Sequence, residues 1–280
     1  MKVVAIVGPT AVGKTSLSID LAKRFNGEII SGDSMQVYRG LDIGTAKVTP
    51  EEMDGVPHHL INVRELDENY SVADFQVAAR QTIQEITERG RLPIVVGGTG
   101  LYIQSLLWDY KLGSEGEPED DTLRKSYEHF GEKNGNQALW ERLQAVDSLA
   151  AEKIHFNNRK KMIRALEVFE LTGHSILEPK EQPEKLYDSF LIGLNTDRAI
   201  LYQQINHRVD LMVEQGLLEE AKKLAETPNV QAAQGIGYKE LSPYFAGEVP
   251  LEAALEEVKL HSRRYAKRQL TWFRNRMSVH

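Results

Sequence analysis

Residues 8–15, with the sequence GPTAVGKT, have the pattern of a phosphate-binding loop. Glycines in this pattern let successive backbone N–H groups surround a phosphate oxygen, and the helix that follows adds the positive end of its dipole. Lys14 brings a positive charge to the outer phosphate, and the Thr15 hydroxyl is placed to hold Mg²⁺. An apolar run at 3–7 precedes the loop and an amphipathic segment at 16–25 follows it, as a strand–loop–helix unit requires. The loop therefore predicts a site for a di- or triphosphate, whether or not that phosphate belongs to a nucleotide.

Two other loops follow predicted strands and carry polar side chains. Asp33 follows the β-like stretch 28–31, and Thr99 lies in a Gly-Gly-Thr-Gly turn after the apolar run 92–96. Ligands of an open α/β sheet bind beyond the carboxyl ends of its strands, so these two loops and the phosphate loop should gather on one edge. Asp33 could then hold Mg²⁺ or act as a general base, and Thr99 could contact an oxyanion or a phosphate. Plainer interpretations remain open: Asp33 could cap its own turn, and Thr99 could lie in a tight βα turn.

Two clusters of basic residues suggest a nucleic-acid partner. Segment 259–276 is rich in Lys and Arg, contains no acid, and includes Tyr265, Trp272 and Phe273. Basic residues interleaved with aromatic ones suit a phosphate backbone and stacked bases. The second cluster is RKKMIR at 159–164. A solvated helix face would explain one cluster, but two clusters in a chain with a formal net charge of −7 favour nucleic acid.

The composition is that of an ordinary globular protein, with 280 residues of which 41% are hydrophobic and 27% charged. The sequence has no cysteine, which excludes disulfides, thiolate zinc sites and Cys nucleophiles. A strand begins almost at the first residue, which leaves no room for a signal peptide, and no apolar stretch approaches the length of a membrane span. We therefore expect a cytoplasmic protein that is not bound to a membrane.

Short apolar strands alternate with helices in the first part of the chain. This alternation predicts an α/β fold with a parallel P-loop-type sheet and helices on both of its faces. The remaining predicted elements are strands at 59–63 and 187–194, and helices at 72–90, 101–107, 122–131, 136–146, 148–154, 159–171, 198–226 and 251–273.

Two polar stretches, at 113–121 and 178–185, interrupt the α/β pattern and have the composition of linkers. The sequence between them has helical periodicity and no strand signal. We therefore predict an all-helical insertion domain at 114–186, set into an α/β core that consists of 1–113 and 187–280.

Taken together and in order, the motifs resemble those of the tRNA dimethylallyltransferase family, also called tRNA isopentenyltransferases. The segments that carry the resemblance are GPTAVGKT at 8–15, SGDSMQVYR at 31–39, GGTGLY at 97–102, RALEV at 164–168, GIGYK at 235–239 and YAKRQLTWFR at 265–274. The resemblance runs from Val4 to Arg274. The lack of cysteine rules out the C-terminal zinc finger of some eukaryotic members, so the chain resembles the bacterial type. Two positions depart from the family pattern, since Phe156 stands where proline is expected and Gln204 where arginine is common.

The resemblance implies that the loop binds dimethylallyl diphosphate rather than ATP. The five-carbon group would pass to N6 of the adenosine at position 37 of tRNA, just 3′ of the anticodon, with Mg²⁺ assisting. Asp33 is implied as the general base on that amine, Thr99 as a group near the bridging oxygen of the leaving diphosphate, and Thr15 as the metal ligand. We expect a monomer.

The resemblance also implies two sets of binding residues. The diphosphate would be held by Gly8, Thr10, Ala11, Val12, Gly13, Lys14, Thr15 and Arg208. The anticodon stem-loop of the tRNA would be held by Asp33, Ser34, Met35, Gln36, Thr99, Arg124, Asn157, Asn158, Arg159, Lys160, Lys161, Gln234, Gly235, Tyr238, Lys239, Arg264, Lys267 and Arg268. The target base must leave its stack to react, which is less costly in an anticodon loop than in a duplex.

Other functions remain open at this point. A P-loop kinase of a small molecule would use the loop for ATP, but gives no reason for two basic clusters. An adenylate isopentenyltransferase would share Asp33 and the loop, but would need neither the insertion nor the basic C-terminal helix. A non-catalytic RNA-binding protein would leave the phosphate loop unexplained.

Overall fold

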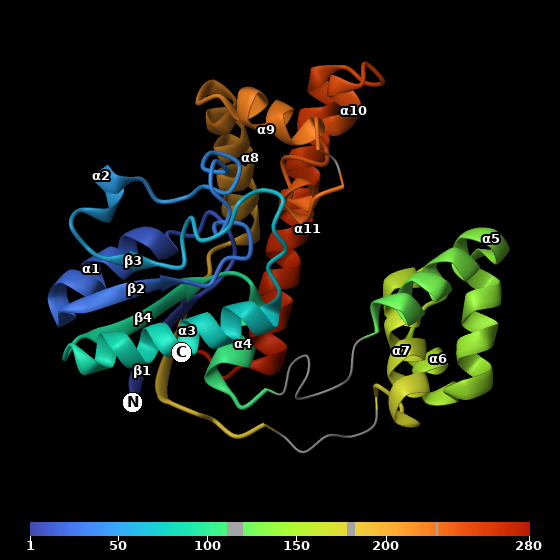
Figure 1. The fold of residues 1–280 in the computed structure, drawn as a ribbon. Coiled ribbons are helices and arrows are strands. Elements are labelled where there is room, and N and C mark those ends of the chain that lie inside the picture. Colours follow the sequence, from blue (N-terminus) through green and yellow to red (C-terminus); the bar gives the residue numbers. More distant parts are fainter. Residues whose placement is uncertain (111–119, 178–182, 228) are drawn as a thin grey trace. The chain divides into compact units, whose positions relative to one another are not determined.

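The chain divides into two compact units in the computed structural model (Figure 1). The described residues are 1–110, 120–177, 183–227 and 229–280. The first unit joins Met1–Asp109 to Lys185–His280, and the second is Tyr110–Glu184. The linker predicted at 113–121, with the domain boundary in it, and the polar stretch predicted at 178–185 lie largely outside the described residues.

The first unit is built on a five-stranded parallel sheet, which confirms the predicted fold class. Its strands are β1 (Lys2–Val7), β2 (Gly27–Ser31), β3 (His58–His59), β4 (Leu92–Gly97) and β5 (Asp188–Gly193). They lie in the order β3-β2-β4-β1-β5. Val7 is in register with both Gly97 and Gly193, so the carboxyl ends of the three neighbouring strands β4, β1 and β5 are level.

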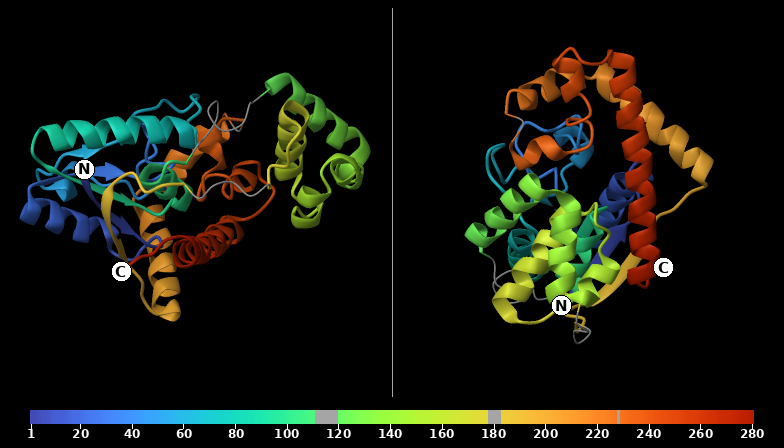
Figure 2. Two further views of the ribbon diagram at one scale, coloured as in Figure 1. Left: turned by 90° about the horizontal axis from the view of Figure 1, so that it is seen from below. Right: turned by 90° about the vertical axis from the view of Figure 1, so that its right-hand side faces the viewer.

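Helices cover both faces of this sheet, because successive side chains of a buried strand point to opposite sides. One face packs against α1 (Lys14–Phe25), and the other packs against α3 (Val72–Glu88) and α4 (Gly100–Leu107) (Figure 2). The strand residues that face α1 include Ile6, Ile29 and Ile94, and those that face α3 and α4 include Ala5, Ile30 and Val95.

The remaining helices of the first unit lie around one end of the sheet and along its side (Figure 1). They are α2 (Pro50–Met53), α8 (Arg198–Glu214), α9 (Leu217–Ala225), the 3₁₀ helix η2 (Gln231–Gln234), α10 (Ser242–Phe245) and α11 (Leu251–Arg276). Helix α8 packs on α11 through a small core that contains Leu201, Ile205 and Ala266. Within the described part of the chain, no helix has both the length and the apolar character that crossing a bilayer requires.

Two predicted elements are wrong in their extent, and backbone conformation explains both. The single helix predicted at 198–226 is two helices, because Gly216 adopts a left-handed conformation (φ 105°) between α8 and α9. The strand predicted at 59–63 ends after its first residue. Leu60 and Asn62 both have positive φ, 61° and 56°, which a paired strand does not accommodate.

The second unit contains the helices α5 (Asp121–Val146), α6 (Ser148–Lys153) and α7 (Arg159–Thr172). They enclose a separate apolar core in which Leu139, Leu143 and Met162 are completely buried. Gly135 interrupts the helical backbone of α5 (φ 84°, ψ 168°), at the point where the sequence pattern separates two helices. A core of its own is what this unit needs to fold by itself.

Candidate functional site

A cleft with a volume of about 1160 Å³ lies at the carboxyl ends of β1, β2 and β4. Its lining comes from the loops that follow these strands and from parts of α8, α9 and α11. The arrangement follows from the parallel sheet, which delivers every strand-to-helix loop to the same edge.

The phosphate loop passes from β1 into α1 through a backbone that few residue types adopt without cost. Ala11 and Gly13 have positive φ, 64° and 91°. For a non-glycine residue such as Ala11 that conformation costs about 1–2 kcal/mol, and strain of this kind is often retained at functional sites. The Lys14 ammonium donates to the carbonyl oxygens of Gly8 (3.0 Å) and Pro9 (2.6 Å), so it lies across the loop.

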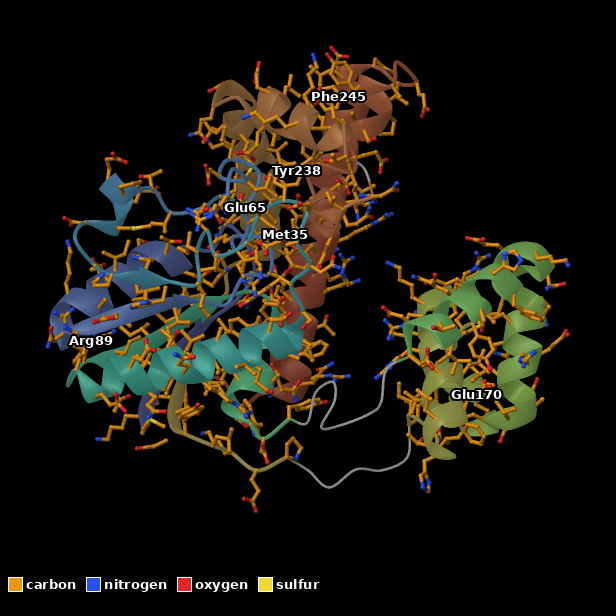
Figure 3. All side chains as sticks on the ribbon, in the orientation of Figure 1. Met35, Glu65, Arg89, Glu170, Tyr238 and Phe245 are labelled. Atoms are coloured by element: carbon orange, nitrogen blue, oxygen red, sulfur yellow. The ribbon has the colours of Figure 1, made fainter. Side chains whose placement is uncertain are left out.

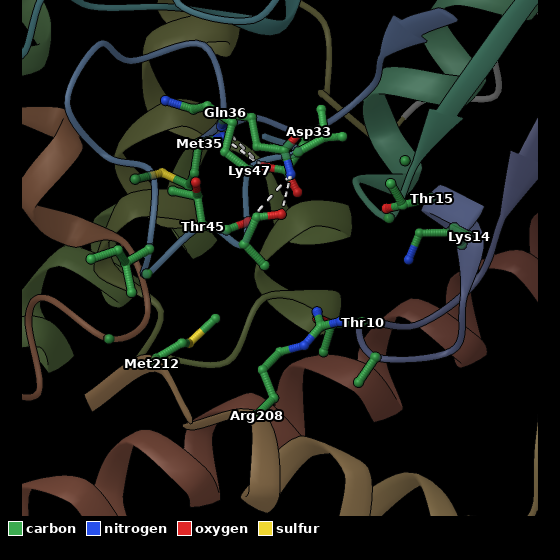
Figure 4. A pocket seen from close by; sticks show the side chains of 18 of the residues that line it. Thr10, Lys14, Thr15, Asp33, Met35, Gln36, Thr45, Lys47, Arg208 and Met212 are labelled. Carbon is green, nitrogen blue, oxygen red and sulfur yellow. Dashed lines mark hydrogen bonds between the residues drawn. The ribbon is translucent and has the colours of Figure 1, made fainter. Parts of the chain in front are cut away.

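Lys14 of the loop and Arg208 of α8 bring two positive charges into the cleft (Figure 4). Arg208 comes from α8, and its Nη1 donates to the Thr10 hydroxyl oxygen at 3.1 Å. Burial lowers the pKa of the Lys14 ammonium to about 8; the Asp33 carboxylate opposes this shift and the positive charge of Arg208 adds to it. Burial likewise lowers the pKa of Arg208 from its ordinary value. Cations that are partly stripped of water bind an anion more strongly than exposed ones.

Asp33 lies in the same cleft, shortly after the end of β2, and one of its two carboxylate oxygens accepts hydrogen bonds. Oδ1 accepts the backbone N–H groups of Met35 (2.8 Å) and Gln36 (3.3 Å), and Oδ2 has no hydrogen bond to the described residues. Burial raises the pKa of Asp33 above its ordinary value, although these N–H groups and the ammonium groups of Lys14 and Lys47 oppose the rise. A carboxylate with one free oxygen and a raised pKa can act as a general base.

Gln269 of α11 joins the phosphate loop to the Gly-Thr-Gly turn. Its side chain is 5% exposed; Oε1 accepts the N–H of Thr10 (3.0 Å) and Nε2 donates to the carbonyl oxygen of Gly98 (3.1 Å). A Cβ atom at Gly98 would lie 2.0 Å from Nε2, so the contact requires glycine there. Burial raises the pKa of the Tyr265 hydroxyl to about 12, and the side chains of Thr99 and Gln269 oppose this rise. One amide thus sets the spacing of two loops at the cleft.

Thr99 and Gly8 lie next to the cleft rather than in its lining. The Thr99 hydroxyl accepts the N–H of Ser34 at 3.3 Å, which links the Asp33 loop to the turn after β4. Gly8 is buried against the Leu194 carbonyl, which would lie 2.6 Å from a Cβ at that position. Both residues therefore support the cleft from behind.

Glu220 of α9, a carboxylate that sequence reasoning missed, holds the loop at 42–44, which lines the cleft. Its oxygens accept the backbone N–H groups of residues 42–44, at 2.8, 2.9 and 2.9 Å, and the hydroxyl of Tyr238 at 2.6 Å. Tyr238 is 4% exposed, so the structure makes this predicted tRNA ligand a buried support of the loop, close to Met35 (Figure 3). Nothing local in the sequence distinguishes Glu220 from its neighbour Glu219.

The same loop is fixed by Gln36 and Lys47. The Gln36 amide donates to the carbonyl oxygens of Thr45 (3.2 Å) and Ala46 (3.4 Å) and accepts the Ser31 hydroxyl (3.0 Å). The buried Lys47 ammonium donates to Tyr38 O, Asp42 Oδ1 and Asn62 Oδ1 at 2.6, 2.7 and 2.7 Å. Gln36 was predicted as a site residue, whereas Lys47 was missed because no local pattern shows that this lysine is buried.

Most of the predicted site residues of the first unit line the cleft together. They are Thr10, Ala11, Val12, Gly13, Lys14, Thr15, Asp33, Ser34, Met35, Gln36, Arg208, Gln234, Gly235, Tyr238, Lys239 and Arg268. Arg264 and Lys267 are exposed on α11, outside the lining.

The other predicted ligands of tRNA belong to the second unit, and two of them are engaged inside it. Arg124 pairs with the fully buried carboxylate of Glu167 (3.1 Å), and Arg159 donates to Asn136 Oδ1 (2.7 Å) and Gly131 O (3.1 Å). These two guanidinium groups stabilise the fold of the unit. The remaining predicted ligands, Asn157, Asn158, Lys160 and Lys161, are exposed.

The described residues contain no group of three or more His, Asp or Glu side chains that could hold a metal ion by themselves. The cleft does offer the hydroxyl of Thr15 and the carboxylate of Asp33. Mg²⁺ prefers such oxygen donors and usually takes its other ligands from water and phosphate. These residues therefore fit a Mg²⁺ ion that arrives with a phosphate ligand.

Comparison with known proteins gives matches over nearly the whole chain. The sequence profile of the family described as IPP transferase matches residues 36–276. The tRNA dimethylallyltransferase of Enterococcus faecalis is 67% identical over 279 residues, which cover 100% of this chain and 90% of that protein. The crystal structure of the full-length tRNA isopentenylpyrophosphate transferase from Bacillus halodurans has a TM-score of 0.75 and 54% identity, covering 99% of this chain and 88% of that one. A eukaryotic dimethylallyltransferase whose crystal structures follow its action on tRNA has a TM-score of 0.83 and 34% identity, covering 97% and 69%.

Proposed function

Since this chain belongs to the IPP transferase family, we propose that it transfers the dimethylallyl group of dimethylallyl diphosphate to N6 of adenosine 37 in tRNA, releasing diphosphate. The observation that carries the proposal is the pairing, in one cleft, of a phosphate-binding loop with a partly free carboxylate. The names of the similar proteins support the same reaction. The protein would work in the cytoplasm, where its tRNA is, and as a monomer.

The diphosphate binds to the loop and to the two cations that face it. Lys14, Arg208 and the backbone N–H groups that follow Gly8 would contact its oxygens, and Thr15 would hold the Mg²⁺ ion. When bound, Mg²⁺ adds positive charge beside the leaving oxygens. During reaction the bond between the allylic carbon and the bridging oxygen breaks, and its electron pair stays on the diphosphate. Preorganised positive charge lowers the energy of that step most, because negative charge develops there.

The acceptor is the amine at N6 of a flipped-out adenosine, held by the loop at 33–36. Its nitrogen forms a bond to the allylic carbon as the C–O bond breaks, and the proton that it loses passes to Oδ2 of Asp33. The raised pKa of Asp33 favours acceptance of this proton. Thr99 lies outside the lining of the cleft and is hydrogen-bonded to Ser34, so it would assist the reaction by holding the loop that carries Asp33. Closure of the site must also exclude water from the allylic carbon.

The tRNA itself would contact surfaces beyond the cleft. In the first unit these would be the exposed Arg264 and Lys267 of α11. They would act together with residues that also line the cleft, which are Arg268, Gln234, Gly235 and Lys239. In the second unit they are residues 157–161. Charge neutralisation by such residues makes affinity for RNA depend on salt.

The reaction should weaken at high pH because Lys14 must be charged to hold a diphosphate. Its pKa of about 8 means that the charge is present at lower pH and lost as the pH rises through that value. We expect kcat/KM for dimethylallyl diphosphate, which reports on the free enzyme, to fall above pH 8. Initial rates at saturating tRNA and low diphosphate, measured against pH, test this. Lys14→Arg stays charged and should lose the alkaline limb; a limb that persists in that variant assigns the titration to another group.

A competition assay separates the proposed function from its alternatives. Purified protein is mixed with Mg²⁺, labelled dimethylallyl diphosphate, an unmodified tRNA transcript, AMP and ATP. We expect the label in tRNA and the ATP intact. Label in AMP would instead indicate an adenylate isopentenyltransferase, and consumption of ATP without prenyl transfer would indicate a kinase.

A further inference from the structure

The turn that precedes α7 presents two stacked aromatic rings to solvent. The rings of His155 and Phe156 have centroids 4.6 Å apart and planes inclined by 27°. Both residues are exposed, and 41% of Phe156 is accessible. A large apolar ring that is left this open contributes little to the core of its own unit.

The turn is held in place by its own hydrogen bonds and by buried neighbours. The N–H of Asn158 donates to the His155 carbonyl oxygen (2.8 Å), and the N–H of Asn157 donates to the His155 ring at Nδ1 (3.2 Å). Ile154 before the turn and Met162 after it are buried in the core of the unit. The turn therefore fixes the orientation of the imidazole. When a base stacks on the pair, the His155 side chain loses little further conformational entropy.

The charges beside the rings are positive. Residues 153–161 contain basic side chains and no acid, and Lys153, Lys160 and Lys161 are exposed. None of these three lysines has an ion pair within the described residues. Arg159 differs, because its guanidinium is occupied by Asn136 and Gly131. Aromatic rings beside free ammonium groups have the chemistry of a site for single-stranded nucleic acid, in which a base stacks and phosphates pair with the cations.

We propose that His155 and Phe156 form a platform on which an unpaired base of the bound tRNA stacks, with Lys160 and Lys161 contacting the adjoining phosphates. The inference rests on the proposed function, because it takes tRNA as the ligand. A base in a duplex has no free face, so the platform takes a nucleotide of a loop. Stacking is tolerant of base identity, so the platform contributes affinity rather than sequence selection.

The test separates stacking from charge by using salt. Binding of an unmodified tRNA transcript to the full chain is measured by fluorescence anisotropy at several salt concentrations. Phe156→Ala should weaken binding about tenfold at every salt concentration, because stacking neutralises no phosphate. Phe156→Trp should restore it. The double variant Lys160→Ala/Lys161→Ala should also weaken binding, but with a shallower dependence on salt. Phe25→Ala is the matched control, since Phe25 is an exposed phenylalanine of the first unit (56% accessible).

The outcomes distinguish failure of the platform from failure of the proposed function. If Phe156→Ala binds like Phe25→Ala, or if Phe156→Trp binds as weakly as Phe156→Ala, the platform is wrong. Transfer of the label to tRNA by the unchanged protein would then leave the proposed function standing. If the unchanged protein neither binds nor prenylates the transcript, the proposed function fails and the platform fails with it. Thermal unfolding of each variant confirms that the second unit is intact.

Discussion

The variant Asp33→Asn should transfer the prenyl group about 10²- to 10⁴-fold more slowly than the unchanged protein, while its affinity for tRNA stays within several-fold. Asparagine has nearly the same shape, and its carbonyl oxygen can still accept the N–H groups of Met35 and Gln36 that Oδ1 accepts now. What it lacks is a basic oxygen to take the N6 proton. The loss should therefore fall on the chemical step and not on the structure of the loop.

Single-turnover rates with pre-bound dimethylallyl diphosphate, together with a separate tRNA titration, measure the two quantities. The acid limb of the pH profile supplies a second readout. The ionised form of Asp33 is the active one and its pKa is raised, so activity should be lost on acidification at a pH above the ordinary range of an aspartate. That limb should vanish in Asp33→Asn. Asp67→Asn, at an exposed aspartate outside the cleft, is the control. An unchanged single-turnover rate in Asp33→Asn would remove Asp33 from the role of base.

The variant Gln269→Glu should lower kcat/KM for dimethylallyl diphosphate about a hundredfold, close to the loss of an oxyanion-stabilising donor. The glutamate can still accept the N–H of Thr10, but it places a carboxylate oxygen where Nε2 now donates to Gly98. The new negative charge is buried beside the site of a diphosphate, where it is poorly screened. The two loops should also separate, because two oxygens 3.1 Å apart without a proton between them repel.

The variant should have a lower kcat/KM for dimethylallyl diphosphate, whereas its affinity for tRNA should stay within several-fold of the unchanged protein. Gln269→Leu, which removes both hydrogen bonds without adding charge, should have a smaller effect. Gln203→Glu, at an exposed position of α8, controls for the change in net charge. If Gln269→Glu and Gln269→Leu both unfold at lower temperature but retain their rates, Gln269 supports the fold and has no part in positioning the site.

The parts of the site that sequence predicted are those encoded in consecutive residues. The phosphate loop, Asp33 and Thr99 each follow a short apolar strand, and a parallel sheet brings the loops after such strands together. The fold class was accessible for the same reason, because strand and helix periodicities are local. The break at Gly216 was missed, since one glycine within a helical pattern does not reveal that it adopts positive φ.

The parts that sequence could not predict depend on contacts between distant segments. Gln269 and Thr10 are 259 positions apart, and Glu220 and Asp42 are 178 apart. Both side chains lie on amphipathic helices where a glutamine or glutamate is common on the solvent face. Their burial against loops of the cleft is decided by how α9 and α11 pack, which no local pattern specifies. Arg124, which the resemblance implies as a tRNA ligand, also has a partner that is distant in the sequence, since it pairs with the buried Glu167 43 positions away.

The sheet order has a consequence for how the chain is made on the ribosome. Strand β1 lies between β4 and β5, and β5 comes after the whole second unit in the sequence. Until residue 188 has emerged, β1 is an unprotected edge strand with apolar side chains and unpaired backbone groups. An edge strand of this kind is prone to aggregate. The second unit has its own core and can fold during that interval. Gln269 is synthesised later still, so the spacing between the phosphate loop and the Gly98 turn is set only when α11 has been completed.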